Sequence, residues 1–158
     1  MLITCGRIDP VTVERLLRSL PEWFGIEQSI LEYVEDARTM TTYLAAPAGE
    51  HQQPVAAMLV TRHFPESAEI HLMAVTPDHH RRGIGRALLR ELERDLAAEG
   101  VSLLQVKTLG PAHPDRHYER TRAFYTAMGF LPLQELPNLW PGNPCLIMVK
   151  HLSACARM

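Results

Sequence analysis

The sequence predicts a mixed α/β fold, with a central sheet of about seven strands and helices on both faces. Three observations favour this class. Short apolar segments bounded by proline and glycine are typical of strands, other segments have helical periodicity, and a strand-helix-strand unit lies in the second half. The predicted order of elements is β-α-α-β-β-β-α-β-α-β-β.

The first third of the chain predicts one strand and two helices. A short strand is expected at Leu2–Arg7, after which Asp9 is a helix N-cap and Pro10 takes the first helical position. Helical spacing defines the inward face of the first helix: Val13, Leu16, Leu17 and Leu20. The second helix is predicted at Glu27–Ala37, with Ile30, Leu31 and Val34 facing inward.

Three strands follow, separated by turn residues as in an antiparallel meander. They are predicted at Met40–Ala46, Val55–His63 and Ala68–Val75. Pro77 ends the third strand, because proline cannot donate to the ladder of a sheet.

The second half predicts a long amphipathic helix at Gly83–Ala98 and a strand at Val101–Leu109. A further helix at Tyr118–Met128 ends at a glycine that favours a left-handed cap. Two closing strands are predicted at Phe130–Leu136 and Leu146–Leu152. On the long helix an apolar stripe, Ile84, Leu88, Leu92 and Leu96, is separated from the basic residues Arg86, Arg90 and Arg94.

The 158 residues predict one domain at 1–152 and a frayed tail at 153–158. The formal net charge of −2 does not favour a nucleic-acid partner. No apolar run approaches the roughly 20 residues that span a bilayer, so we expect no membrane contact and a cytoplasmic location. Three widely spaced cysteines, with no ligand spacing among the histidines, predict neither a disulfide framework nor a metal site.

The most informative segment joins the strand Glu69–Val75 to the long helix. After the basic turn His80–Arg82, Gly83 and Gly85 open the helix. Glycine lets a ligand approach the backbone, and the first amides of a helix have no intrahelical partner and favour an anion. This pattern predicts a phosphate or pyrophosphate cradle. Two glycines alone would also suit a plain turn with solvated arginines.

The glycine segment is neither a Walker A loop nor a dinucleotide fingerprint, because no GxxxxGK[ST] occurs and Leu88 stands at the third glycine position. It resembles motif A of the GNAT superfamily of N-acetyltransferases, [Q/R]-x-x-G-x-[G/A], with His80 in place of the first Gln or Arg. Thr121–Phe130 is similar to the FY-x-x-x-GF block of that family. Tyr118 stands where the family often has asparagine.

The resemblance implies acetyl-CoA as acyl donor and a primary amine as acceptor. It also implies that the pantetheine arm binds along the strand that precedes the glycine loop. Two sets of cofactor-binding residues follow from it: on the strand Met73, Ala74 and Val75, and on the loop and helix His80, Arg81, Arg82, Gly83, Ile84, Gly85, Arg86 and Ala87.

Acetyl transfer to an amine needs a neutral amine, and a base assists in removing the proton. Glu69 is the candidate base, directly or through water, with a pKa that we expect burial to raise. His71, on the same face of the strand, is the alternative. The resemblance makes Tyr125 the candidate general acid for the leaving thiolate, although a core aromatic would also fit. Arg122 is either a cofactor or substrate contact or a surface charge.

The acceptor is less defined. Three segments are candidate walls of its site: Glu22–Glu27, His113–Asp115 and Trp140–Pro144. Trp23 and Phe24 would hold a cation or simply anchor the helix turn. Aminoglycosides, polyamines, amino acids and protein N-termini all remain open. The alternative to an enzyme is an acyl-CoA-binding sensor or regulatory protein without turnover. The alternative reactions are transfer of a longer acyl group and acetyl transfer to oxygen. A homodimer is also compatible with the resemblance.

Overall fold

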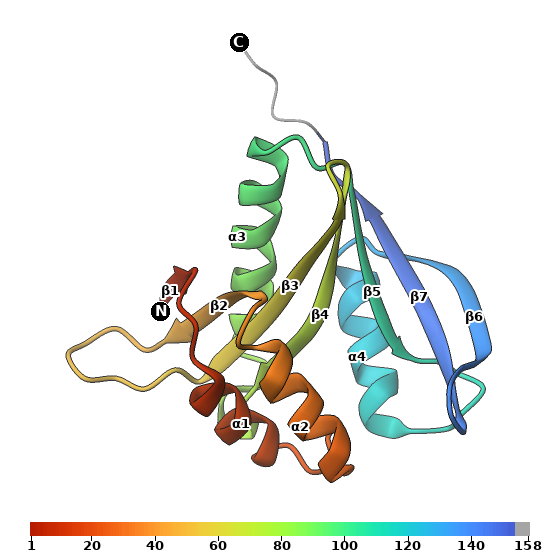
Figure 1. Cartoon of the computed structure of the whole chain (residues 1–158), viewed down its shortest axis with the longest axis horizontal. Helices are drawn as coiled ribbons and strands as arrows, with labels where there is room; N and C mark the ends of the chain where they lie inside the picture. The colour runs from red at the N-terminus through yellow and green to blue at the C-terminus, as the bar shows by residue number, and fades with distance from the viewer. Residues whose placement is uncertain (154–158) are drawn as a thin grey trace. The chain divides into compact units, whose positions relative to one another are not determined.

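The computed structural model describes residues 1–153. Its seven strands are β1 (Leu2–Cys5), β2 (Thr41–Ala46), β3 (Ala56–Phe64), β4 (Ser67–Val75), β5 (Leu103–Leu109), β6 (Leu131–Trp140) and β7 (Asn143–His151). Its helices are α1 (Pro10–Arg18), α2 (Glu27–Asp36), the 3-10 turn η1 (Pro77–His79), α3 (Ile84–Ala98) and α4 (Arg116–Ala127). The predicted order of strands and α-helices is confirmed (Figure 1).

The strands form one mixed sheet in the order β1-β2-β3-β4-β5-β7-β6, which confirms the predicted fold class. The β4–β5 pair is parallel, and the pairs β1–β2, β2–β3, β5–β7 and β6–β7 are antiparallel. The chain forms two compact units. Of the described residues, the first unit contains Met1–Thr61 and His71–Asp95, and the second contains Arg62–Ile70 and residues 96–153.

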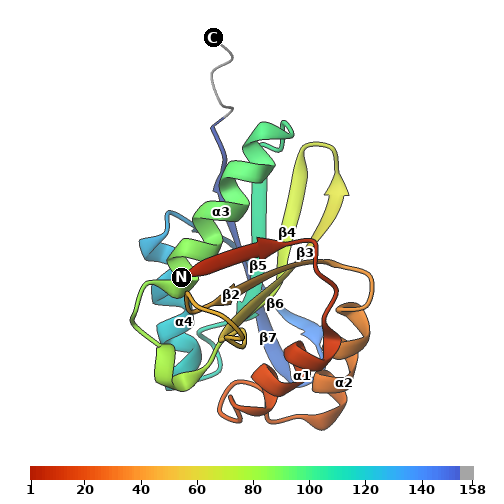
Figure 2. The same cartoon turned by 90° about the vertical axis from the view of Figure 1, so that its left-hand side faces the viewer.

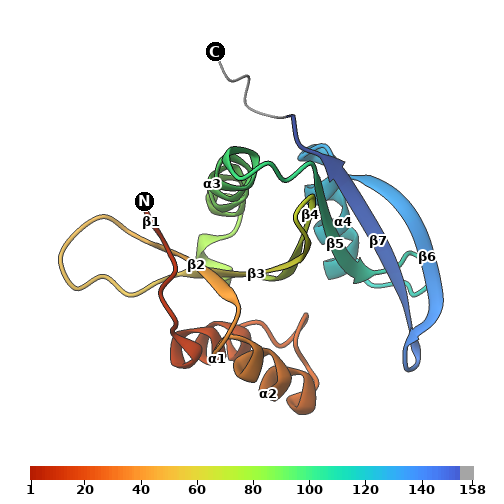
Figure 3. The same cartoon turned by 45° about the horizontal axis from the view of Figure 1, so that its top comes forward.

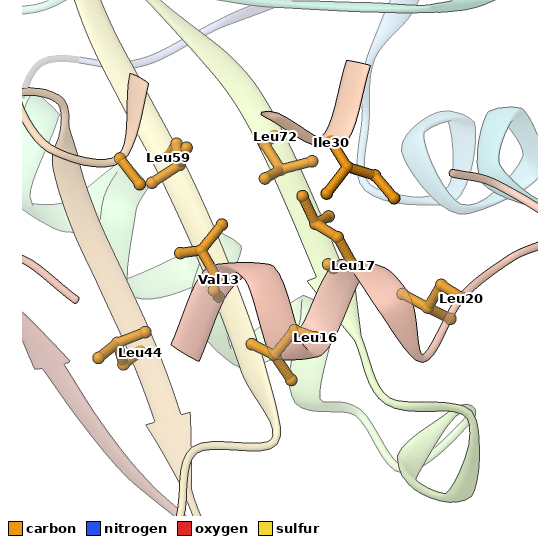
Figure 4. Packing of buried hydrophobic residues seen from close by; sticks show 11 residues of the cluster. Val13, Leu16, Leu17, Leu20, Ile30, Leu44, Leu59 and Leu72 are labelled. Atoms are coloured by element: carbon orange, nitrogen blue, oxygen red, sulfur yellow. The ribbon is translucent and has the colours of Figure 1, made fainter. Parts of the chain in front are cut away.

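The core of the first unit lies where α1 and α2 pack against its strands. α1 begins as predicted, because the Asp9 carboxylate accepts a hydrogen bond from the Thr12 amide at 3.1 Å. Figure 4 shows side chains of α1 turned toward Leu44, Leu59 and Leu72 of β2, β3 and β4. The four apolar residues predicted for the inward face of the first helix are all buried. Removing such a buried leucine side chain costs about 2–5 kcal/mol.

The prediction for the inward face of α2 is partly wrong. Ile30 is buried and Val34 packs against the core, but Leu31 is 48% exposed. Ile30 and Val34 are four residues apart and share a helix face, whereas Leu31 lies about 100° around the axis from Ile30. Figures 2 and 3 show α1 and α2 side by side, so one narrow stripe of α2 suffices for this contact.

Helix α3 has the predicted amphipathic pattern. The four residues of the predicted stripe are buried, and Arg86, Arg90 and Arg94 are exposed. Gly100 ends this segment with a φ of +84°, in the left-handed region that glycine occupies without strain.

The second unit contains the hairpin of β6 and β7, strand β5 and helix α4. The predicted boundaries of α4 and β6 are wrong in part. α4 begins at Arg116, two residues early, because the Asp115 carboxylate caps the amides of His117 and Tyr118. β6 extends four residues further, to Trp140, because it pairs with β7 as far as the turn at Gly142.

No helix within residues 1–153 combines the length and the hydrophobicity needed to cross a bilayer. Of the predicted frayed tail at 153–158, the described residues include only Ser153. The rest of the tail, with Cys155, lies outside them.

Candidate functional site

The loop between β4 and α3 has the backbone that the glycine pattern predicts. Gly83 has a φ of +77°, and no heavy atom lies within 4 Å of the place that a Cβ would occupy. Arg81 also has a positive φ, of 61°. The backbone of this loop therefore turns away from the body of its unit and leaves open space in front of Gly83.

The N-terminal amides of α3 are available to a ligand. The first backbone hydrogen bond of this helix joins the Ala87 amide to the Gly83 carbonyl at 3.0 Å, so the amides of residues 83–86 have no intrahelical partner. A cavity of about 360 Å³ adjoins this end, lined by Met1, Pro47, His79, Arg82, Gly83, Ile84 and Ala87. Free amides, the positive end of the helix dipole and exposed arginines suit a diphosphate.

The side chain of His80 contacts the end of β4 and the ring of Trp23. Its Nε2–H donates to the carbonyl of Val75 at 2.6 Å, and its ring packs edge-on against Trp23 at 5.5 Å between centroids. His80 therefore ties the loop back to the end of β4. The neighbouring His79, which is not among the predicted site residues, lines the cavity.

The predicted cofactor residues of β4 lie at its C-terminal end. Ala74 is buried, whereas Met73 and Val75 are half-buried. The carbonyl of Val75 already accepts the bond from His80, which leaves one lone pair for a ligand.

Glu69 lies in the second unit and is the centre of a polar cluster. Its side chain is only 6% exposed. One oxygen, Oε1, accepts three hydrogen bonds: from His63 Nε2 at 2.7 Å, Gln105 Nε2 at 2.8 Å and Lys107 Nζ at 3.3 Å. Within residues 1–153, Oε2 accepts none, so it is the oxygen that remains free to take a proton.

The expectation of a raised pKa at Glu69 is wrong. Burial is the largest single influence and does raise the pKa, but the hydrogen bonds from His63 and Gln105 and the charge and hydrogen bond of Lys107 together lower it below 4.5. The sequence indicated burial on a strand but could not show three donors supplied by two other strands. Glu69 is therefore ionised at neutral pH.

His71, the alternative base, lies in the first unit. Its Nε2 is 2.7 Å from Asp36 Oδ2 on α2, and its ring packs against Tyr33 at 5.3 Å. The carboxylate can only accept, so His71 Nε2 carries the proton and Nδ1 is the basic nitrogen. Glu69 and His71 are two residues apart on β4, yet the structure gives them separate sets of partners.

Tyr125 lies on α4 in the second unit and is 4% exposed. Its ring contacts Phe124 and Phe130 edge-on, at 5.1 and 5.3 Å. Burial raises its pKa well above the ordinary value of a tyrosine, so the hydroxyl stays protonated. Within residues 1–153 this hydroxyl makes no hydrogen bond and can donate to an incoming group. The side chain is thus part of the core and still carries a free polar end.

Several other candidates have structural roles. Arg122 Nη1 donates to the carbonyl of Leu109 at 2.7 Å and thereby ties α4 to the end of β5. Trp23 and Phe24 pack against the core of the first unit, and Glu27 pairs with Arg18 at 2.7 Å, which favours the anchor interpretation of this segment. Asp115 is the cap of α4.

Sequence reasoning missed His63, Gln105, Lys107 and Asp36, the partners of the two candidate bases. A period of two along β5 places Gln105 and Lys107 on one face, but the register that brings Glu69 opposite Gln105 is not written in any local pattern. Among residues 1–153, no group of three or more His, Cys, Asp or Glu side chains has the arrangement needed to hold a metal ion.

Comparison with known proteins gives one family. The sequence profile described as "Acetyltransferase (GNAT) domain" matches residues 30–132. An uncharacterized protein of Mycobacterium leprae is 27% identical over 145 residues, which are 89% of this chain; the match spans 38% of that relative's length.

Solved structures show the same fold. A Desulfovibrio desulfuricans protein assigned to the GNAT family of acetyltransferases superposes with a TM-score of 0.80 at 20% identity, covering 96% of this chain and all of that one. An aminoglycoside 6'-N-acetyltransferase complexed with coenzyme A superposes with a TM-score of 0.74 at 21% identity, covering 97% and 98%. At these identities, the likeness is one of fold.

Proposed function

The chain belongs to the GNAT acetyltransferase family, and from that premise we propose that it transfers the acetyl group of acetyl-CoA to a primary amine. The observation that carries the proposal is the N-terminus of α3, where free amides, a positive-φ glycine and exposed arginines adjoin a cavity. The coenzyme A complex of the aminoglycoside acetyltransferase supports the choice of donor. Acetyl-CoA supplies an acetyl group activated as a thioester.

Residues 80–87 would hold the diphosphate of the donor. The amides of Gly83–Arg86 donate hydrogen bonds, and Arg81, Arg82 and Arg86 add positive charge at the same helix end. His80 positions the loop through Val75. The backbone of Met73–Val75 would bind the extended arm of the donor as an added strand does.

Glu69 would accept the proton of the amine at Oε2. An alkylamine with a pKa near that of lysine is about three units from neutral at pH 7, so deprotonation costs about 4 kcal/mol. Because the pKa of Glu69 is lowered, it is a weak base for a free ammonium ion. We therefore assign its proton transfer to the moment when the new N–C bond makes the nitrogen acidic, either directly or through water.

Tyr125 would donate a hydrogen bond to the leaving sulfur. Its raised pKa lies above the roughly 8.5 of a thiol, so complete transfer of the proton to the thiolate is uphill. The same raised pKa keeps the hydroxyl in its donating form at every physiological pH. Hydrogen-bond stabilisation, with a later proton from water, is the role that this environment favours.

Calorimetry with acetyl-CoA tests the proposal. We expect micromolar-range binding, and at least a tenfold loss in Gly83→Ala, because alanine strains the positive-φ loop. The matched control is Gly100→Ala, which has a similar φ of +84° and equally open surroundings. Equal losses in both variants, or no binding by the wild type, would contradict the proposed site.

A thiol-release assay over a panel of amines separates an enzyme from a sensor. Glu69→Gln and Tyr125→Phe should lower the rate and leave acetyl-CoA affinity intact. Binding without thiol release from any amine would favour a sensor. Comparing acetyl-CoA with longer acyl-CoAs defines the donor.

We propose three further properties of this acetyltransferase: one domain at residues 1–152, a cytoplasmic location and a homodimer. They rest on the length, on apolar runs too short to span a bilayer and on the family, respectively. Limited proteolysis, cell fractionation and analytical ultracentrifugation test them in turn.

A further inference from the structure

The second unit exposes one face of its strands and buries the other. Residues directly opposite each other in neighbouring strands share a face, so Glu69, Gln105 and Val149 lie together, and Lys107 lies with Ile147. Gln105, Lys107, Ile147 and Val149 are half-buried, whereas Glu69 and, further along the same face, Leu109 and Cys145 are buried. The residues of the opposite face are buried: Leu104, Val106, Thr108, Leu146 and Met148. A ligand can therefore reach the first face.

The charges on this open face do not favour a polycation. The carboxylate of Glu69 is already paired with Lys107 at 3.3 Å and also accepts a hydrogen bond from His63 at 2.7 Å. The Cys145 thiol on the same face is buried, and burial raises its pKa, so it adds no negative charge. An acceptor with several ammonium groups would meet Lys107 without a compensating anion.

Lys107 has hydrogen-bonding capacity to spare. An ammonium group carries three donors, and within residues 1–153 only Glu69 takes one. The side chain is 31% exposed, so an anion can reach it. The Lys107 ammonium group is in contact with the Glu69 carboxylate. If one substrate binds both side chains, the two substrate groups that do so must therefore lie only a few ångströms apart.

We propose that the acceptor is an amine that carries a carboxylate close to its nitrogen, as an α-amino acid does, and that Lys107 is the residue that selects it. The inference rests on the proposed acetyl transfer with Glu69 as base. Lys107 binds the acceptor carboxylate, Glu69 Oε2 faces the amine, and Ile147 and Val149 offer an apolar surface to the rest of the molecule.

Thiol release with matched amines tests the inference. Leucine and 3-methylbutylamine share the apolar body and differ by the carboxylate, and spermidine represents a polycation. We expect kcat/KM for leucine to exceed that for 3-methylbutylamine at least tenfold, and spermidine to be the poorest of the three. Equal or better use of either carboxylate-free amine overturns the inference and leaves acetyl transfer standing. Thiol release with none of them, together with absent acetyl-CoA binding, overturns both.

Variants of Lys107 assign the preference to one side chain. Lys107→Gln should bring the ratio of kcat/KM for leucine to kcat/KM for 3-methylbutylamine toward one, through a higher KM for leucine. Lys107→Arg should retain most of the preference for leucine. Arg120→Gln removes an equal charge from the exposed surface of α4 and should leave the ratio unchanged. An unchanged ratio in Lys107→Gln, or an equal loss in Arg120→Gln, overturns the role of Lys107.

Discussion

Two carboxylate–histidine pairs, one in each unit, have the same separation and opposite surroundings. His63 and Glu69 are 2.7 Å apart, as are His71 and Asp36. In the first pair the carboxylate is 6% exposed and the histidine 42%; in the second the carboxylate is 38% exposed and the histidine 27%. A short distance therefore does not define a role. The less exposed member of each pair is the candidate base, and its partner orients it.

The environment separates the pairs further. Glu69 is additionally held by Gln105 and Lys107, so its orientation is fixed and its pKa is lowered. Asp36 faces solvent, where charge interactions are screened and contribute about 1 kcal/mol or less. We expect the Glu69 pair to control catalysis and the Asp36 pair to contribute little.

The largest expected effect is on turnover. Glu69→Gln should lower kcat roughly 10²–10⁴-fold, the range for loss of a general base, while Asp36→Asn should change it less than about fivefold. Steady-state thiol-release kinetics with a productive amine measure both. A greater loss in Asp36→Asn or in His71→Gln would move the base to the first unit.

The second-largest difference between the two pairs is expected in thermal stability. Glu69→Gln leaves Lys107 without its ion-pair partner, a loss of about 1–3 kcal/mol, or roughly 2–10 °C in Tm at this chain length. Because the folded pKa of Glu69 is lowered, its stabilisation is present above pH 4.5 and is lost as the pH falls through the folded pKa.

Calorimetric scans at pH 7 and at pH values below 4.5 check this sign. The difference in Tm between wild type and Glu69→Gln should become smaller in acid. The difference in Tm between wild type and Asp36→Asn should be smaller at every pH. A gap that widens in acid would contradict the lowered pKa.

A smaller effect is expected from the histidine partner of Glu69. His63→Leu removes one of the bonds that lower the pKa of Glu69, so the acid limb of the kcat/KM profile should move to higher pH, with a several-fold loss at pH 7. His63→Gln keeps a neutral donor and should recover part of the activity. If neither variant moves the acid limb, His63 does not act through Glu69.

The smallest effect should come from salt. Raising the ionic strength from about 0.1 M to 1 M shortens the screening length from roughly 10 to 3 Å. The stability that Asp36 contributes should fall by a few tenths of a kcal/mol, and that of the more buried Glu69 pair by less. Denaturant melts of wild type, Asp36→Asn and Glu69→Gln at both salt concentrations measure the difference.

Local signals predicted most of the fold. Asp9-Pro10 starts α1, the leucine stripe of α3 is buried, and Gly129 ends α4 with a φ of +93°, because capping, periodicity and positive φ depend on neighbours within a few residues. The errors at Leu31 and at the end of β6 have a different origin. The width of a buried helix face and the end of a strand depend on the element packed against them.

The sequence by itself determined the order of the elements and the glycine-opened helix end, since both follow from residues adjacent along the chain. Only the tertiary structure decided which groups surround Glu69. Its partners Gln105 and Lys107 lie 36 and 38 positions away, and the register of β4 against β5 sets their approach. The electrostatics of a buried group depend on everything within a few ångströms, and such distances across a sheet are set by folding.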